Sequence, residues 1–178
     1  SGRAQVPPAP ETTFTKNVDT QWTNAGNWYN GVPVNPPGPP DDARIGDGNT
    51  AIWNQQANGD PAFGTLTLGV GSTLQYQANG NQGLPAGSDV YFSDGSTLQY
   101  TAGSSNRDDN FFVIPGATAT FETASNTFFR GTLQGAGNLD VEVNGNFEIR
   151  KDASNFTGDL TITNGSATSR LVWLRQFG

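Results

Sequence analysis

Cysteine, histidine and methionine are all absent from this sequence of 178 residues. Without histidine or cysteine, the chain cannot form a Ser-His-Asp triad, a cysteine nucleophile, a zinc site with nitrogen and sulfur ligands, or a haem or iron–sulfur centre. Disulfides are excluded too, so packing and backbone hydrogen bonds must hold the fold together. Any catalysis would have to depend on carboxylate, tyrosine, lysine or serine side chains.

Charge is also scarce, because only 14% of the residues are charged and the formal net charge is −7. The nine basic residues are dispersed along the chain without a cluster beyond the adjacent pair Arg150-Lys151, whereas a nucleic-acid partner requires a basic track that follows the phosphates. We therefore predict no nucleic-acid partner. No apolar run approaches the ~18 residues of a membrane span, so we predict no membrane-spanning segment.

The remaining polar residues are mainly Asn, Gln, Ser, Thr and Gly, which is typical of an exported protein with a neutral, hydrogen-bonding surface. The sequence begins at Ser1 and contains no methionine, so we expect that a signal peptide has been removed. A segment cut from a larger protein is the alternative. The composition predicts a secreted, extracellular protein of the cell surface.

The first 41 residues differ in composition from the rest. Residues 1–20 contain Pro7, Pro8 and Pro10 and predict an extended N-terminal arm that ends in an edge strand. Residues 21–41 predict a cap and loop rich in tryptophan and proline, because the five prolines within 32–40 exclude both helix and interior strand.

Residues 42–178 carry an internal repeat. The hexapeptide Gly-Ser-Thr-Leu-Gln-Tyr at 71–76 recurs unchanged at 95–100, and degraded copies open at Gly116, Gly137 and Gly158. Repeats at this spacing that contain strands and no helical periodicity indicate a stacked β architecture. We predict an all-β fold: a right-handed parallel β-solenoid of about five short coils, with the extended arm at its N-terminus.

Alternate residues of each short strand should point into the solenoid core. Glycines and Asn-Gly pairs should provide the corners with positive φ, at 79–80, 144–145 and 164–165. The residues expected to point inward are Leu66, Leu68, Leu74, Tyr76, Val90, Phe92, Leu98, Tyr100, Phe111, Val113, Phe147, Ile149, Leu160 and Ile162.

Four segments carry a family resemblance: the stretch from Trp22 to Gly31-Val32-Pro33, Asp-Ala-Arg-Ile at 42–45, residues 83–90 and residues 155–162. Over about residues 20–168, the chain resembles exported bacterial proteins with autotransporter-associated β-strand repeats, which are passenger-like β-helices. The resemblance implies a right-handed β-helix and a place outside the cell. Its motifs are corner glycines and core aliphatics, so it implies a fold and no particular activity.

The acidic residues predict no enzyme. Adjacent acids at 41–42 and 108–109 are typical of turns, as is Asp47-Gly48-Asn49, so we predict no metal ion and no cofactor. The alternative is a polysaccharide lyase or hydrolase in which acids converge on one side of the solenoid. The acids of that alternative are Asp89, Asp94 and Glu122.

Four aromatic residues, Trp22, Trp28, Tyr29 and Trp53, allow two interpretations. Large aromatic side chains bury much apolar surface and can plug the N-terminal end of a solenoid. Alternatively, they form a platform for stacking sugars, and the protein is a carbohydrate-binding or adhesive surface module with extracellular polysaccharide as its partner.

The two ends of the chain suggest self-assembly, because natural proteins cap, charge or pair the strand edges at a solenoid end. We predict an extracellular structural protein, a head-to-tail homopolymer that forms a filament, sheath or matrix by end-to-end stacking and N-terminal strand exchange. Alternatively, residues 1–20 fold back on their own subunit, or Trp173 and Phe177 cap the last coil. The inserted anchors would be Val6, Phe14 and Val18, and the acceptors Leu171, Trp173, Leu174 and Phe177.

Overall fold

The computed structural model describes residues 7, 12–33, 41–54, 63–77, 84, 87–101, 105–150, 153, 155–164 and 171–174. For residues 105–107, 164 and 171–174, only the backbone is described.

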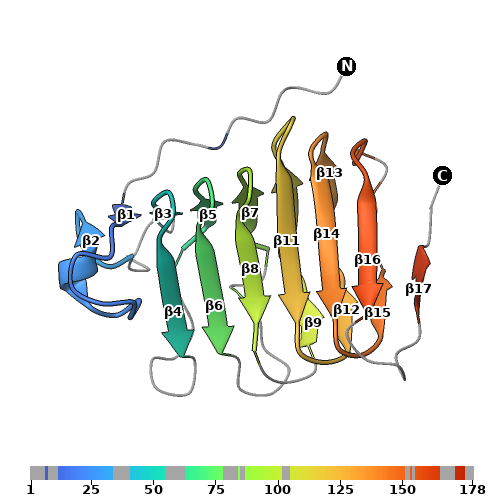
Figure 1. Ribbon diagram of the computed structural model, residues 1–178, viewed down its shortest axis with the longest axis horizontal. Helices are drawn as coiled ribbons and strands as arrows, with labels where there is room; N and C mark the ends of the chain where they lie inside the picture. Colours follow the sequence, from blue (N-terminus) through green and yellow to red (C-terminus); the bar gives the residue numbers. More distant parts are fainter. Residues whose placement is uncertain are drawn as a thin grey trace.

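The strands stack into three sheets that run along one axis (Figure 1). Among the described strands, every pairing is parallel except that of β1 with β2, which is antiparallel. Sheet A contains, in spatial order, β13 (Leu133–Gly135), β10 (Asn110–Val113), β7 (Asp89–Phe92), β5 (Thr65–Leu68), β3 (Asp42–Ile45), β1 (Thr12–Phe14) and β2 (Trp28–Tyr29). Sheet B contains β16 (Leu160–Asn164), β14 (Asn138–Val143), β11 (Thr118–Thr123), β8 (Thr97–Tyr100), β6 (Thr73–Gln77) and β4 (Thr50–Asn54). Sheet C contains β17 (Leu171–Leu174), β15 (Phe147–Ile149), β12 (Thr127–Phe129) and β9 (Ser105–Arg107).

Successive strands of sheet A are separated by one turn of the coil. The chain passes from β3 through β5, β7 and β10 to β13 and so completes about four turns, after which β14, β15 and Phe156, which bridges to Gly135, continue the winding. The helical content of the described residues is one short 3₁₀ turn, η1 (Ala25–Asn27). The predicted parallel β-solenoid is confirmed.

The predicted ladders form its core. Leu74 pairs in register with Leu98, and Tyr76 with Tyr100, as the exact hexapeptide repeat requires. The tyrosine rings lie edge to face with centroids 5.1 Å apart. All of the residues predicted to point inward are buried except Leu160 and Ile162, which are partly buried against the core at its C-terminal end.

The corners are formed by the glycines that open each repeat. Gly71, Gly95 and Gly116 have φ of +62°, +66° and +80°, a backbone conformation that glycine adopts without strain. The Asn-Gly pair at 144–145 lies between β14 and β15, but its glycine is required for space: a Cβ there would lie 2.6 Å from the Asn126 nitrogen. Gly80 and Gly165 lie outside the described residues.

The N-terminal part differs from the predicted arm. β1 lies between β3 and β2 in sheet A, so the predicted strand is an integral strand of this chain's own sheet and does not lie at its edge. Phe14 is fully buried, with its ring 5.3 Å from that of Trp28. Residues 12–20 therefore belong to the first layer of the solenoid.

Candidate functional site

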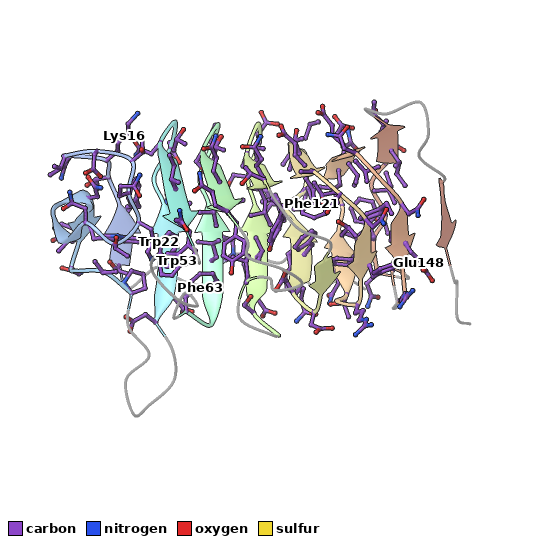
Figure 2. All side chains as sticks on the ribbon, turned by 90° about the horizontal axis from the view of Figure 1, so that it is seen from below. Lys16, Trp22, Trp53, Phe63, Phe121 and Glu148 are labelled. Atoms are coloured by element: carbon purple, nitrogen blue, oxygen red, sulfur yellow. The ribbon has the colours of Figure 1, made fainter. Side chains whose placement is uncertain are left out.

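The first candidate site is an aromatic cluster at the N-terminal end of the solenoid, which Figure 2 shows around Trp22, Trp53 and Phe63. The ring of Trp22 lies 4.6 Å from Trp28, 5.3 Å from Trp53 and 5.7 Å from Phe63, measured between centroids. Its contacts with the other two indoles are edge to face, the arrangement that aromatic pairs favour. We call these four residues the aromatic cap.

A buried amide fixes the loop that covers the aromatic cap. Asn27 is fully buried, and its Oδ1 accepts hydrogen bonds from the backbone nitrogens of Val18 (2.9 Å) and Asp19 (3.0 Å). Its Nδ2 donates to Asp19 Oδ1 (2.7 Å) and to the Gln21 carbonyl (2.9 Å). Hydrogen bonds from Asn24, Asn27 and the Gln21 nitrogen lower the pKa of Asp19 below its usual value. The first turn is thus held by a polar network as well as by ring packing.

The burial of the three indoles decides between the two interpretations of this cluster. Trp22, Trp28 and Trp53 are between 1% and 6% exposed, so none presents a ring face to a sugar. The structure therefore supports the plug, while Tyr29, at the end of β2, is 69% exposed.

Those residues predicted for assembly that the structure describes lie in elements at opposite ends of the solenoid. Phe14, predicted as an inserted anchor, is instead buried in the core of its own chain and is not free to be donated in this conformation. Val18 is 65% exposed at the N-terminal end. Leu171, Trp173 and Leu174 lie in β17, which pairs with β15, while Val6 and Phe177 lie outside the described residues.

The three acids of the lyase or hydrolase interpretation do not converge. Asp89 begins β7 in sheet A, where it accepts a hydrogen bond from Asn110 (2.9 Å). Asp94 lies in the turn between β7 and β8 and accepts a hydrogen bond from the backbone nitrogen of Thr118, the first residue of β11 (2.9 Å). Glu122 belongs to β11 of sheet B. Across the residues that the structure describes, no three acidic side chains are grouped in a way that would hold a metal ion.

Glu122 instead borders a hollow of about 270 Å³ at the outer face of sheet B. Glu122 lies in register with Glu142 on β14 and with Gln99 on β8, and Gln99 donates a hydrogen bond to Glu122. Thr101 and Asn144 also line the hollow. Amide, hydroxyl and carboxylate groups of this kind bind the hydroxyl groups of a neutral ligand.

A further feature, which the sequence analysis missed, lies on the outer face of sheet A. Tyr91 on β7 and Phe112 on β10 are in register, and their rings stack with centroids 4.8 Å apart and planes inclined by 15°. Burial, followed by the charges of Asp89 and Asp42, raises the pKa of Tyr91 above its usual value. The sequence did contain a signal for this pair: in Asn-Phe-Phe-Val at 110–113 the alternation of apolar and polar residues is lost, so that an aromatic residue occupies an outward position.

Within the described part of the chain, no helix has the length and apolar character needed to cross a membrane. Comparison of the sequence with protein-family models, with curated proteins and with solved structures finds no match in any of the three.

Proposed function

We propose that this protein is an extracellular structural protein whose copies stack end to end into a filament, sheath or matrix. The observation that carries the proposal is that each end of the solenoid has apolar side chains that are exposed or incompletely buried. Val18 and Tyr29 lie among exposed polar residues at the N-terminal end, and Leu160 and Ile162 lie at the C-terminal end. Export and a place at the cell surface rest on the neutral, hydrogen-bonding composition and on the resemblance to exported bacterial repeat proteins.

The N-terminal end presents apolar side chains on a rigid base. Three large hydrophobic residues are exposed in the described structure, and two of them, Val18 and Tyr29, belong to the loop and strand around the aromatic cap. The backbone nitrogen of Val18 is fixed by Asn27, and β2 stops after two residues, where Asn30 and Gly31 have positive φ. A strand this short offers little edge for pairing. Contact at this end is therefore made by side chains.

The C-terminal end presents the last layer of the core. In the described structure, β16 is the final strand of sheet B and β17 is the final strand of sheet C. Leu160 and Ile162 of β16 are only partly buried, whereas the matching residues one and two coils earlier are almost completely covered. An apolar surface from the next copy would complete this layer, because removing apolar area from water stabilises the contact.

A carbohydrate-binding or adhesive surface module is the second candidate function. The polar hollow beside Gln99, Glu122 and Glu142 favours it, with extracellular polysaccharide as the partner. We propose no catalytic role, since Asp89 on sheet A, Asp94 in the turn between β7 and β8, and Glu122 on sheet B lie apart and each has a structural hydrogen bond.

The test of stacking is electron microscopy and size-exclusion chromatography of the chain at micromolar concentration. Filaments or oligomers should form, and Val18→Asp combined with Tyr29→Asp should abolish them. Val70→Asp is the matched control, because Val70 is also exposed but lies in the turn between β5 and β6, on the side of the solenoid. A monomeric wild-type chain, or equal loss with the control, would contradict the proposal.

The test of the second candidate is retention on immobilised polysaccharides. Glu122→Gln and Glu142→Gln together should weaken retention at least several-fold if the hollow binds carbohydrate. Retention that is unchanged in this double variant would remove the hollow from consideration.

A further inference from the structure

Two Asn-Gly dipeptides lie wholly within the described structure, at 30–31 and at 144–145. Asparagine is thermolabile, and it loses its side-chain amide most readily before glycine, which has no side chain to shield its backbone nitrogen from the neighbouring carboxamide. The reaction needs water and enough backbone motion to bring the two groups together. The surroundings of each dipeptide therefore decide whether it can react.

The dipeptide at 144–145 is held tightly in a corner between β14 and β15. The backbone nitrogen of Asn144 donates to the Thr123 carbonyl (2.9 Å), and that of Asn146 donates to Asn126 Oδ1 (2.7 Å). A Cβ on Gly145 would lie 2.6 Å from the Asn126 nitrogen. Both flanks are thus bonded to the preceding coil, and the backbone has no room to rotate unless the coil opens.

The dipeptide at 30–31 lies at the surface, directly after β2 at the N-terminal end of sheet A. Asn30 and Gly31 are both exposed, and a Cβ on Gly31 would have no described atom within 4 Å beyond its chain neighbours. Their φ values are +69° and +89°, a turn conformation that few other residues tolerate. The Thr12 hydroxyl bonds the carbonyls of Tyr29 and Gly31, which flank the peptide that must rotate. Opening this surface turn disturbs far less structure than opening a coil.

We propose that Asn30 is a site of spontaneous deamidation. The backbone nitrogen of Gly31 attacks Asn30 Cγ and loses its proton, while the Cγ–Nδ2 bond breaks and the side-chain nitrogen leaves as ammonia. The product is a five-membered succinimide ring. Water then adds to either carbonyl carbon of the ring and opens it, which yields aspartate or isoaspartate. The reaction involves no change of oxidation state and needs water alone as co-reactant.

The modification changes the end of the molecule that we propose to stack. Either product places a carboxylate beside Tyr29, which is 69% exposed, in a chain whose net charge is already −7. A charge at an apolar contact must give up its water when the contact forms, which opposes assembly. Deamidation of Asn30 therefore weakens stacking as the protein ages. This consequence depends on the proposed stacking, whereas the deamidation itself does not.

The deamidation is tested by incubating the full-length protein at mildly alkaline pH and following both dipeptides by peptide mass spectrometry. Asn30 should convert at least tenfold faster than Asn144 in the folded protein. In urea, which removes the protection by the fold, the two rates should differ by less than threefold. Equal rates in the folded protein, faster conversion of Asn144, or a tenfold difference that persists in urea would overturn the proposal.

The consequence is tested with Asn30→Asp, which reproduces the aspartate product. This variant should raise the concentration needed for assembly several-fold, measured by sedimentation. Gln75→Glu adds the same charge to the outer face of sheet B and should leave that concentration within twofold of wild type. Equal effects of the two variants would overturn the consequence, because net charge would then be the cause. A wild-type chain that does not assemble would contradict stacking, and with it the consequence, while the two conversion rates would still decide whether Asn30 is a deamidation site.

Discussion

The position that opens each repeat requires glycine for two different physical reasons. At Gly71, Gly95 and Gly116 the backbone has positive φ. At Gly137 and Gly158 the neighbouring coil is too close: a Cβ would lie 2.3 Å from the Ile114 carbonyl oxygen and 1.9 Å from the Gly137 carbonyl oxygen, respectively. Glycine at the start of the repeat is therefore needed for its backbone conformation in the early coils and for its lack of a side chain in the late coils.

These two reasons predict different responses to substitution. Gly116→Ala should cost about 1–2 kcal/mol, the penalty for a left-handed residue, and Gly116→Asn should cost less because asparagine tolerates this conformation. Gly158→Ala should cost more, about 3 kcal/mol, and Gly158→Asn should give no relief because both side chains meet backbone. Urea unfolding of the four variants measures the difference. Relief by asparagine at both positions would contradict the steric account of Gly158.

The lowered pKa of Asp19 predicts how the stability of the first turn changes in acid. Its pKa is lowered in the folded protein by hydrogen bonds from Asn24, Asn27 and the Gln21 nitrogen. The folded state therefore binds this proton less readily than the unfolded state. The stabilisation is complete above the ordinary aspartate pKa of about 3.9 and is lost as pH falls through the folded value.

Melting temperature should consequently fall less steeply below about pH 4 in Asp19→Asn than in the wild-type chain. Asp108→Asn, which removes one exposed acid elsewhere, serves as the control and should follow the wild-type curve. Parallel curves for Asp19→Asn and wild type would show that the Asp19 network does not contribute to acid stability.

At the scale of elements, the sequence was most informative where the repeat was exact. The hexapeptides at 71–76 and 95–100 define both the register and the inward face, because period-two alternation leaves one apolar side. The position of β1 was not predictable, since Thr12–Phe14 is stabilised by β3 and β2, which come later in the chain. The stacked Tyr91 and Phe112 were missed because outward aromatics break the alternation on which the prediction relied.

The aromatic plug was one of two open interpretations of Trp22, Trp28 and Trp53, and their burial supports it. The hollow of sheet B depends on Glu122 and Glu142 lying side by side on adjacent strands. This pairing could be predicted only from the register of the degraded repeats, which is harder to assign than that of the exact repeat. Long-range placement of this kind follows from the winding of the coil, and composition alone carries no information on it.

The integration of β1 predicts a large cost for Phe14→Ala. The side chain is completely buried against Trp28, so its removal should destabilise the protein by about 3–5 kcal/mol. Thr13→Ala on the same strand, where the side chain is half-buried on the outer face, should cost less than about 1 kcal/mol. Urea unfolding followed by tryptophan fluorescence measures both. Equal costs would mean that β1 is not an integral strand.

The whole molecule is asymmetric along its axis. At the N-terminal end, the aromatic cap and the short strand β2 close the first layer. The described part of sheet C begins only with β9, whereas sheets A and B already contain β3 to β6. At the C-terminal end, Leu160 and Ile162 leave the last core layer partly uncovered. For the end-to-end stacking that we propose, two unlike ends favour a head-to-tail contact, which propagates as an open polymer, over a two-fold dimer.

The charge of the whole molecule predicts how the proposed polymer would respond to salt. Each copy carries a formal net charge of −7, while the proposed contact is apolar. At 10 mM salt the screening length is about 30 Å, so neighbouring copies repel one another; at 100 mM it is about 10 Å. Raising NaCl from about 10 to about 100 mM should therefore lower the concentration needed for assembly several-fold, measured by sedimentation.

The Val18→Asp, Tyr29→Asp variant controls for salt-induced aggregation and should stay monomeric at both concentrations. Assembly that weakens with salt would instead mean that oppositely charged groups join the ends, and the apolar stacking model would have to be abandoned.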